Sequence, residues 1–115
     1  MNISELLSKL SSSPDAVQFD EVISVIDESY NFSPCRFSNG AAVNEAGQNN
    51  GSCKVFAFAK RHNLSEQQTL HCFGDFYRKD VLANPDGADH QNIRNFIVTG
   101  WSGINFDDVP LRDKQ

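Results

Sequence analysis

Cys53 and His90 are the residues of this chain whose types and positions best suit a nucleophile and a general base. Cys53 follows Ser52 at the predicted first position of a helix, where unsatisfied backbone N–H groups can lower the pKa of a thiol. His90 lies at the predicted start of another helix, on its inward side. Each residue also has a structural explanation, because unpaired cysteines are usually buried and inert and inward histidines are usually hydrogen-bonded core residues. A thiol-dependent enzyme would need the fold to bring the two side chains within hydrogen-bonding reach.

A second group of candidate residues carries side-chain amides and a hydroxyl, which orient ligands well but transfer protons poorly. Asn44 and Asn50 belong to a polar, turn-rich loop at residues 44–51, and Asn92 lies on the predicted helix after residue 88. Ser52 is the predicted N-cap of the helix that follows the loop. The same amides would serve equally well to tie a loop to a helix, so ligand binding and a structural role both remain open.

Arg94 and Trp101 complete the candidate ligand-binding residues. The guanidinium of Arg94 could hold a carboxylate or a phosphate, and an ion pair with Asp80 or Asp89 explains it equally well. Trp101 stands among glycines and could stack on a ligand or close the core. The chain has no Walker loop, dinucleotide-binding glycine fingerprint, HExxH helix or GxSxG elbow. Its three cysteines lack the spacing of a metal site, so we expect neither a metal nor a cofactor.

The elements that must position these residues can be read from the spacing of apolar side chains. The predicted helices cover residues 3–11, about 19–30, 52–62, 65 to about 82, and 88–98. Val55 to Ala59 is apolar on nearly every side, which indicates that the 52–62 helix is central and buried. Ser65 and Gln68 have the spacing of a capping box, and Gly74 indicates close packing between helices. Two short strands, at 35–41 and 103–107, are predicted to pair.

These elements predict a small, mainly helical α+β fold with about five helices and a minor two-stranded β element. The length of 115 residues fits a single domain, residues 1–115, with a frayed tail at 110–115. In this arrangement the 44–53 loop lies near the start of the 88–98 helix, where polar groups would converge.

Composition and charge restrict the expected partners and location. The net charge of −5 argues against binding to nucleic acid or to anionic membranes, which require clustered Lys and Arg. No secretory signal and no apolar run of transmembrane length are visible. Scattered, unpaired cysteines suit a reducing compartment. We therefore expect a cytoplasmic monomer whose partner is an unknown protein or small molecule.

Several longer motifs are similar to those of a known family. They include the Asn39-Gly40 turn, the helix start Gly51-Ser52-Cys53-Lys54 and the run Asp89-His90-Gln91-Asn92, within segments 37–40, 44–59, 72–82, 89–96 and 100–106. Over roughly residues 3–111 the chain resembles the bacterial HopJ type III effector family. The resemblance implies a protein delivered into host cells through type III secretion. It implies no established activity, cofactor or catalytic residue.

Three hypotheses about function follow. The leading one is a binding or effector module whose polar cleft recognises a small ligand or a protein. The alternative is a thiol-dependent enzyme in which Cys53 is the nucleophile, His90 the base, and Asn92 or Asp89 orients the imidazole. The third is a purely structural core of buried amides, for which Asn44→Ala and Asn92→Ala would lower stability and change little else.

Overall fold

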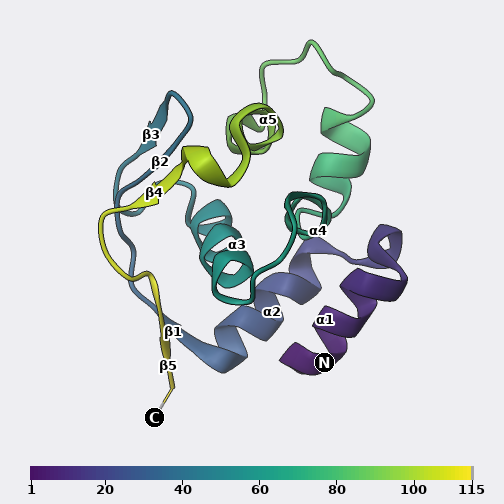
Figure 1. The fold of residues 1–115 in the computed structure, drawn as a ribbon, viewed down its shortest axis with the longest axis vertical. Coiled ribbons are helices and arrows are strands. Elements are labelled where there is room, and N and C mark those ends of the chain that lie inside the picture. The colour runs from purple at the N-terminus through teal and green to yellow at the C-terminus, as the bar shows by residue number, and fades with distance from the viewer. Residues whose placement is uncertain (115) are drawn as a thin grey trace.

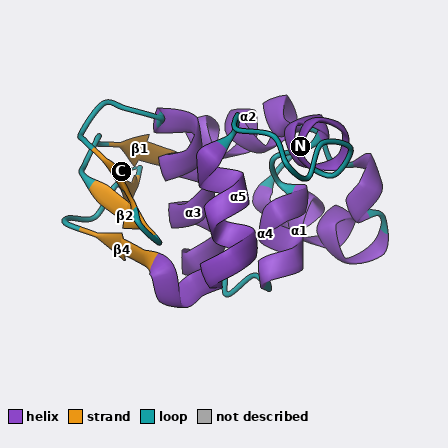
Figure 2. Cartoon of the chain, turned by 90° about the horizontal axis from the view of Figure 1, so that it is seen from above, coloured by secondary structure: helices purple, strands orange, loops and turns teal. Residues whose placement is uncertain are grey.

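The strands lie on one side of the molecule and most of the helices on the other, as the computed structural model shows for residues 1–114 (Figure 1, Figure 2). The α-helices are α1 (Ile3–Ser12), α2 (Phe19–Ser29), α3 (Asn50–Arg61), α4 (Glu66–His71) and α5 (Gln91–Thr99). Shorter helical turns are the 3₁₀ turns Pro14–Ala16 and Gly100–Gly103 and the π-helix Phe76–Val81. The strands are β1 (Tyr30–Phe32), β2 (Phe37–Asn39), β3 (Ala42–Asn44), β4 (Ile104–Phe106) and β5 (Leu111–Asp113). The predicted α+β class, mainly helical with about five helices, is confirmed.

The larger of two antiparallel sheets has the strand order β3-β2-β4. Phe37 in the central strand lies opposite Asn44 on one side and Phe106 on the other. The predicted pairing of residues 35–41 with 103–107 is therefore confirmed. The sheet gains a third strand because the chain turns at residues 40–41 and returns as β3, so the prediction of only two strands was wrong.

The second sheet joins β1 to β5 near the C-terminus. Phe32 lies opposite Leu111, and Tyr30 lies opposite Asp113. Leu111 is only 2% exposed, and burying this side chain holds the last strand in place. The predicted fraying of residues 110–115 is therefore wrong for residues 111–113. Residue 115 lies outside the described residues.

The first two helices match their predicted ranges closely. Leu6 of α1 and Ile26 of α2 are fully buried, as the apolar spacing requires. Asn2 and Glu5 form a capping box at the start of α1, where the Asn2 side chain accepts a hydrogen bond from the Glu5 N–H at 2.8 Å. A salt bridge of 2.8 Å between Lys9 of α1 and Glu21 of α2 joins the two helices.

Helix α3 is the central element, as predicted from its apolar run. It lies between the strands and the other helices in Figure 1. The Phe56 ring, fully buried, has its centroid 5.0 Å from that of Phe96 and 5.4 Å from that of Phe73. The helix begins at Asn50, so the prediction that Ser52 is its N-cap was wrong.

The helix predicted to follow Ser65 is interrupted at Gly74. Ser65 accepts a hydrogen bond from the Gln68 N–H at 3.1 Å, so the predicted capping box is confirmed. Gly74 has a φ of +60°, and a Cβ atom there would lie 2.7 Å from the backbone nitrogen of Phe19. The expected close packing is thus present, and the positive φ ends α4 before the π-helix begins. This break turns Phe73 and Phe76 toward α2.

Helix α5 begins three residues later than predicted, at Gln91. His90, the residue before it, adopts a left-handed conformation with a φ of 51°. At the other end, Gly100 has a positive φ of 59°, and its ψ of −152° places it outside the left-handed helical region. Trp101 follows, and its N–H donates to the Glu66 carboxylate at 3.1 Å.

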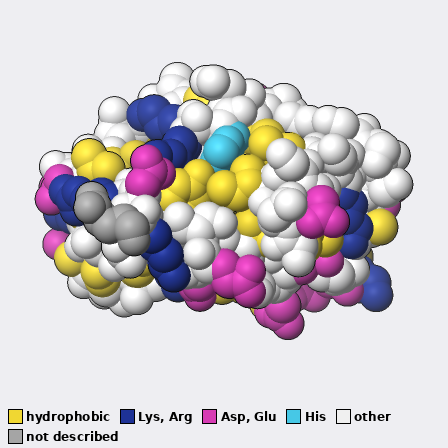
Figure 3. Space-filling model, turned by 90° about the horizontal axis from the view of Figure 1, so that it is seen from below, with side chains coloured by type: hydrophobic (Ala, Val, Ile, Leu, Met, Phe, Trp, Pro, Cys, Tyr) yellow, Lys and Arg dark blue, Asp and Glu magenta, His cyan; other side chains and the backbone are white. Residues whose placement is uncertain are grey.

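The Cα radius of gyration is 13.3 Å, which matches the value of about 13 Å expected for one compact domain of this length. The face in Figure 3 shows basic and acidic side chains near one another, with a histidine among hydrophobic side chains. Charges of both signs are thus mixed on this face.

Candidate functional site

A reciprocal pair of buried amides forms the frame of the candidate site. The Asn92 side-chain NH₂ donates to Asn44 Oδ1 at 3.0 Å, and the Asn44 NH₂ donates to Asn92 Oδ1 at 3.1 Å. Asn49 donates a further hydrogen bond to Asn44 Oδ1 at 2.7 Å. Asn44 and Asn92 are both buried, so these bonds replace the water that their amides lose. The predicted convergence of the 44–53 loop with the start of the 88–98 helix is confirmed.

Asn39 extends this amide cluster into the sheet. Its side chain is 0% exposed and donates to the Asn92 carbonyl at 2.7 Å and to Asn92 Oδ1 at 3.1 Å. Asn95 donates back to the Asn39 carbonyl at 3.2 Å. Asn39 Oδ1 is buried and has no hydrogen-bond partner among the described residues. The cluster therefore fastens strand β2 to helix α5.

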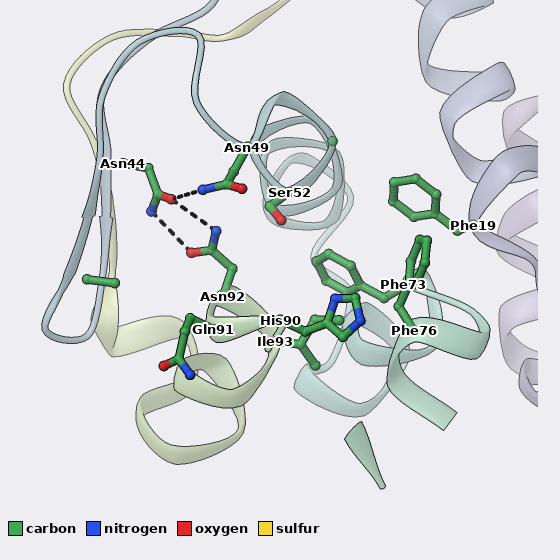
Figure 4. A pocket seen from close by; sticks show the side chains of 12 residues that line it. Phe19, Asn44, Asn49, Ser52, Phe73, Phe76, His90, Gln91, Asn92 and Ile93 are labelled. Carbon is green, nitrogen blue, oxygen red and sulfur yellow. Dashed lines mark hydrogen bonds between the residues drawn. The ribbon is translucent and has the colours of Figure 1, made fainter. Parts of the chain in front are cut away.

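A cavity of about 410 Å³ opens beside the amide cluster (Figure 4). Its polar side includes the Asn44–Asn92 pair and Ser52, and its apolar side holds three phenylalanine rings. The lining residues are Phe19, Ala42, Asn44, Asn49, Gly51, Ser52, Phe73, Phe76, His90, Gln91, Asn92 and Ile93. The sequence-predicted residues Asn44, Ser52, His90 and Asn92 are therefore brought together around one space.

Both α3 and α5 begin at the cavity, and they begin in the same way. Asn49 and His90, the residues before them, are left-handed, with φ of 52° and 51°. Within the described residues, no side chain caps the first-turn N–H groups of either helix. Those N–H groups carry the positive end of the helix dipole. The polar side of the cavity is consequently rich in hydrogen-bond donors.

His90 lies at the edge of the cavity with a fixed orientation. Its Nε2 is 3.0 Å from Asp80 Oδ2 and 3.8 Å from Asp89 Oδ2, and its side chain is 28% exposed. The imidazole also packs near the Phe76 ring, at 5.2 Å between centroids. A carboxylate that accepts from one ring nitrogen orients the other, as in many general bases.

Cys53 does not line the cavity. The side chain is 2% exposed, and the neighbouring Cys35 is also buried. Burial raises the pKa of the Cys53 thiol to about 12, and the neighbouring Cys35 contributes to the rise. Burial also raises the pKa of Cys72 to about 12. The structure does not pair Cys53 with His90, and it gives no support to Cys53 as a nucleophile.

The other three candidate residues do not line the cavity. Asn50 is exposed at the first position of α3. Arg94 pairs with Asp89 at 2.6 Å and also donates to the Asn84 carbonyl at 2.8 Å, so it binds the loop before α5. Trp101 donates from Nε1 to the Leu64 carbonyl at 3.2 Å and packs edge-on against core rings. The contacts of both residues therefore match the structural roles considered for them, which were an ion pair for Arg94 and closure of the core for Trp101.

Sequence reasoning did not identify the apolar wall of the cavity or the partner of His90. The apolar spacing accounts for Phe19, Phe73 and Phe76 as core-facing residues of their helices, and the break at Gly74 has no signal of its own in that spacing. Asp80 was considered only as a partner of Arg94. The proximity of Asp80 and His90 follows from the turn at residues 84–87, whose path the sequence leaves open.

Across residues 1–114, no group of three or more His, Cys, Asp or Glu side chains is arranged to hold a metal ion. None of the helices in that range has the length and apolarity to cross a membrane.

Comparison with known proteins gives the family of the chain. A family model described as HopJ type III effector protein matches residues 3–111. The chain belongs to the HopJ family. The resemblance seen in the sequence motifs is thereby confirmed over the same residues.

A solved structure shares the fold of this HopJ protein. The crystal structure of the unknown-function protein VPA0580 superposes with a TM-score of 0.97 and 49% sequence identity, and the match covers 99% of this chain and 95% of that chain. A comparison with curated proteins gave no match. The two matches establish family and fold, and the cavity is the feature from which a function can be argued.

Proposed function

We propose that this HopJ protein is a binding module that holds a small molecule in the cavity between the starts of α3 and α5. One observation supports this function above the others: a cavity of about 410 Å³ is lined by five segments of the chain, which together extend from Phe19 to Ile93. Cavities of this size, with apolar walls and a few oriented polar groups, are the usual binding places of small ligands. The amide cluster keeps the walls in position, and it leaves Ser52 and the first-turn N–H groups to meet the ligand.

The roles of the lining residues differ under this proposal. Asn44 and Asn92 satisfy each other and act as a rigid wall. Ser52, which makes no hydrogen bond to the other residues drawn in Figure 4, contacts the ligand directly. His90, oriented by Asp80, contacts the ligand at the edge of the cavity. The net charge of −5 supports a partner other than nucleic acid or a membrane surface, and the protein acts as a monomer.

Two variants on one strand test the function. Ala42 lines the cavity, whereas the next residue, Val43, is half exposed and does not. Ala42→Phe fills the cavity, and Val43→Phe adds the same ring outside it. We expect small molecules found by ligand-observed NMR, from a fragment library, to bind the wild type and Val43→Phe but not Ala42→Phe. Equal binding by all three proteins, or no binding to the wild type, would contradict the proposal.

The family description supports a second part of the proposal, which concerns location. We propose that the protein is made in the bacterial cytoplasm and exported through type III secretion, as the description HopJ type III effector protein suggests. An epitope-tagged chain should reach the culture medium from a strain with a working type III apparatus. It should stay in the cells of a matched strain without that apparatus. Equal amounts in both media would contradict export by this route.

A further inference from the structure

We propose that the ligand of the cavity is a planar aromatic molecule carrying a planar acyl group, either a carboxylate or a carboxamide. This inference rests on the binding function proposed above and adds the chemical class of the ligand. It combines two halves of the cavity that come from different elements: an aromatic half from α2 and residues 73–76, and a donor half from the starts of α3 and α5.

The aromatic half offers ring faces and edges to a flat molecule. Phe19 and Phe73 are nearly parallel, with an interplanar angle of 14° and centroids 6.3 Å apart. Phe76 meets Phe19 edge-on at 5.2 Å, and His90 lies 5.2 Å beyond Phe76. Phe76 is 41% exposed, so part of its surface is free to contact a ligand. Aromatic rings contact one another best in stacked or edge-on arrangements, which favours a planar aromatic ligand over a bulky aliphatic one.

The donor half offers N–H and O–H groups to a planar acyl group. Asn44 and Asn92 hydrogen-bond to each other through their side chains, so the donors that remain on this side of the cavity are the Ser52 hydroxyl and those first-turn N–H groups of α3 and α5 that have no backbone partner. An acyl oxygen can accept from these donors. Asn49 donates its NH₂ to Asn44, which leaves Asn49 Oδ1 as an acceptor for the NH₂ of a carboxamide.

The charge of the cavity favours an acyl group with one negative charge or none. No Lys, Arg, Asp or Glu is among the described residues that line it. Arg and Lys are the usual partners of a diphosphate, and a carboxylate is the usual partner of a buried ammonium. A single carboxylate or a neutral carboxamide can be held by N–H and O–H donors alone.

Three probes test the ligand class by isotope-edited NMR titration. They are 2-naphthoate, 2-naphthamide and adamantane-1-carboxylate, applied to the wild type, Ala42→Phe, Ser52→Ala and Phe76→Leu. We expect at least one naphthalene probe to bind the wild type and to be lost in Ala42→Phe. Ser52→Ala should weaken this binding roughly tenfold, and Phe76→Leu roughly threefold to tenfold. The preferred naphthalene probe identifies the acyl group as a carboxylate or a carboxamide.

The outcomes separate the ligand class from the binding function. If adamantane-1-carboxylate binds in the cavity and both naphthalene probes do not, the aromatic class is wrong and the binding function stands. The same conclusion follows if the NMR fragments that Ala42→Phe excludes are all non-aromatic. If a naphthalene probe binds but Ser52→Ala and Phe76→Leu change nothing, the assigned contacts are wrong. If Ala42→Phe excludes no molecule at all, the ligand class and the binding function both fail.

Discussion

The amides of the cavity divide into those that hold the fold and those that are free to meet a ligand. Asn44 and Asn92 bond to each other, and Asn39 bonds to Asn92 from the neighbouring strand. A buried amide that loses its partner keeps its desolvation cost, so removing one member penalises the other. The hypothesis of a structural amide core therefore explains Asn39, Asn44 and Asn92. The hypothesis of a binding cavity explains the donors beside them, which are the Ser52 hydroxyl and the first-turn N–H groups.

Asn92→Ala should lower the free energy of unfolding by about 1–3 kcal/mol, because it removes the side-chain acceptor to which the buried amides of Asn39 and Asn44 both donate. Gln91→Ala is the matched control on the same turn, since the exposed Gln91 amide donates to the nearby Ala88 carbonyl. Urea unfolding followed by tryptophan fluorescence measures both variants. A loss no larger for Asn92→Ala than for Gln91→Ala would contradict the structural role of the amide pair.

Cys53 should react slowly with an alkylating agent, because its thiol is buried and its pKa is raised to about 12. At pH 8 the alkylation rate in the folded protein should be on the order of a thousandfold below that of the same residue in urea. Peptide mapping by mass spectrometry separates Cys53 from the other thiols. His90→Ala should leave the rate unchanged. Rapid alkylation that becomes slower in His90→Ala would restore the thiol-enzyme hypothesis.

At the scale of single elements, the starts of helices show what local sequence can and cannot predict. The capping box at Ser65 is contained in four residues, and it was predicted correctly. The starts of α3 and α5 were misplaced by two or three residues because Asn49 and His90 adopt left-handed conformations. Side-chain contacts with residues that precede the helix accompany these conformations, such as the bonds from Asn49 to Asn44 and from His90 to Asp80. Such contacts are not visible in a local pattern.

Gly74→Ala should destabilise the protein by more than about 1 kcal/mol, since Gly74 has a positive φ and lies against the backbone of Phe19. Gly47→Ala is a control that separates the two causes. Gly47 also has a positive φ, of 91°, but a Cβ atom added there would meet nothing within 4 Å beyond its chain neighbours. Urea unfolding of both variants should show the larger loss for Gly74→Ala. Equal losses would mean that backbone strain alone accounts for the effect.

At the scale of the whole molecule, the sequence predicted arrangements that involve two segments better than those that involve several. The pairing of the 35–41 and 103–107 strands, the central position of α3 and the approach of Asn44 to Asn92 were all predicted. The aromatic wall was missed because Phe19 and Phe76 meet only after the chain breaks at Gly74 and returns to α2. A cavity assembled from five segments depends on all their connections together.

A buried histidine, His71, and a partly buried one, His62, make the stability of the whole fold depend on pH. Burial lowers the pKa of His71, and Arg78, which donates to His71 Nδ1 at 3.2 Å, lowers it further, while Asp15 opposes the shift. Burial also lowers the pKa of His62, and the adjacent Arg61 adds to the effect. Each imidazole therefore binds a proton less readily in the folded chain than in the unfolded chain.

Acidification should consequently weaken the fold. The ordinary pKa of histidine is about 6.5, so above that pH both states are neutral and the stability is fully present. As the pH falls below about 6.5, the unfolded chain takes up protons that the folded chain does not, and stability is lost until the pH passes the lowered pKa of each folded histidine.

Urea unfolding at pH 7.5 and at pH 5.5 should show the wild type less stable at the lower pH. His62→Gln and His71→Gln should each reduce this difference, and the double variant should reduce it most. A double variant that keeps the full difference would assign the pH dependence to other groups.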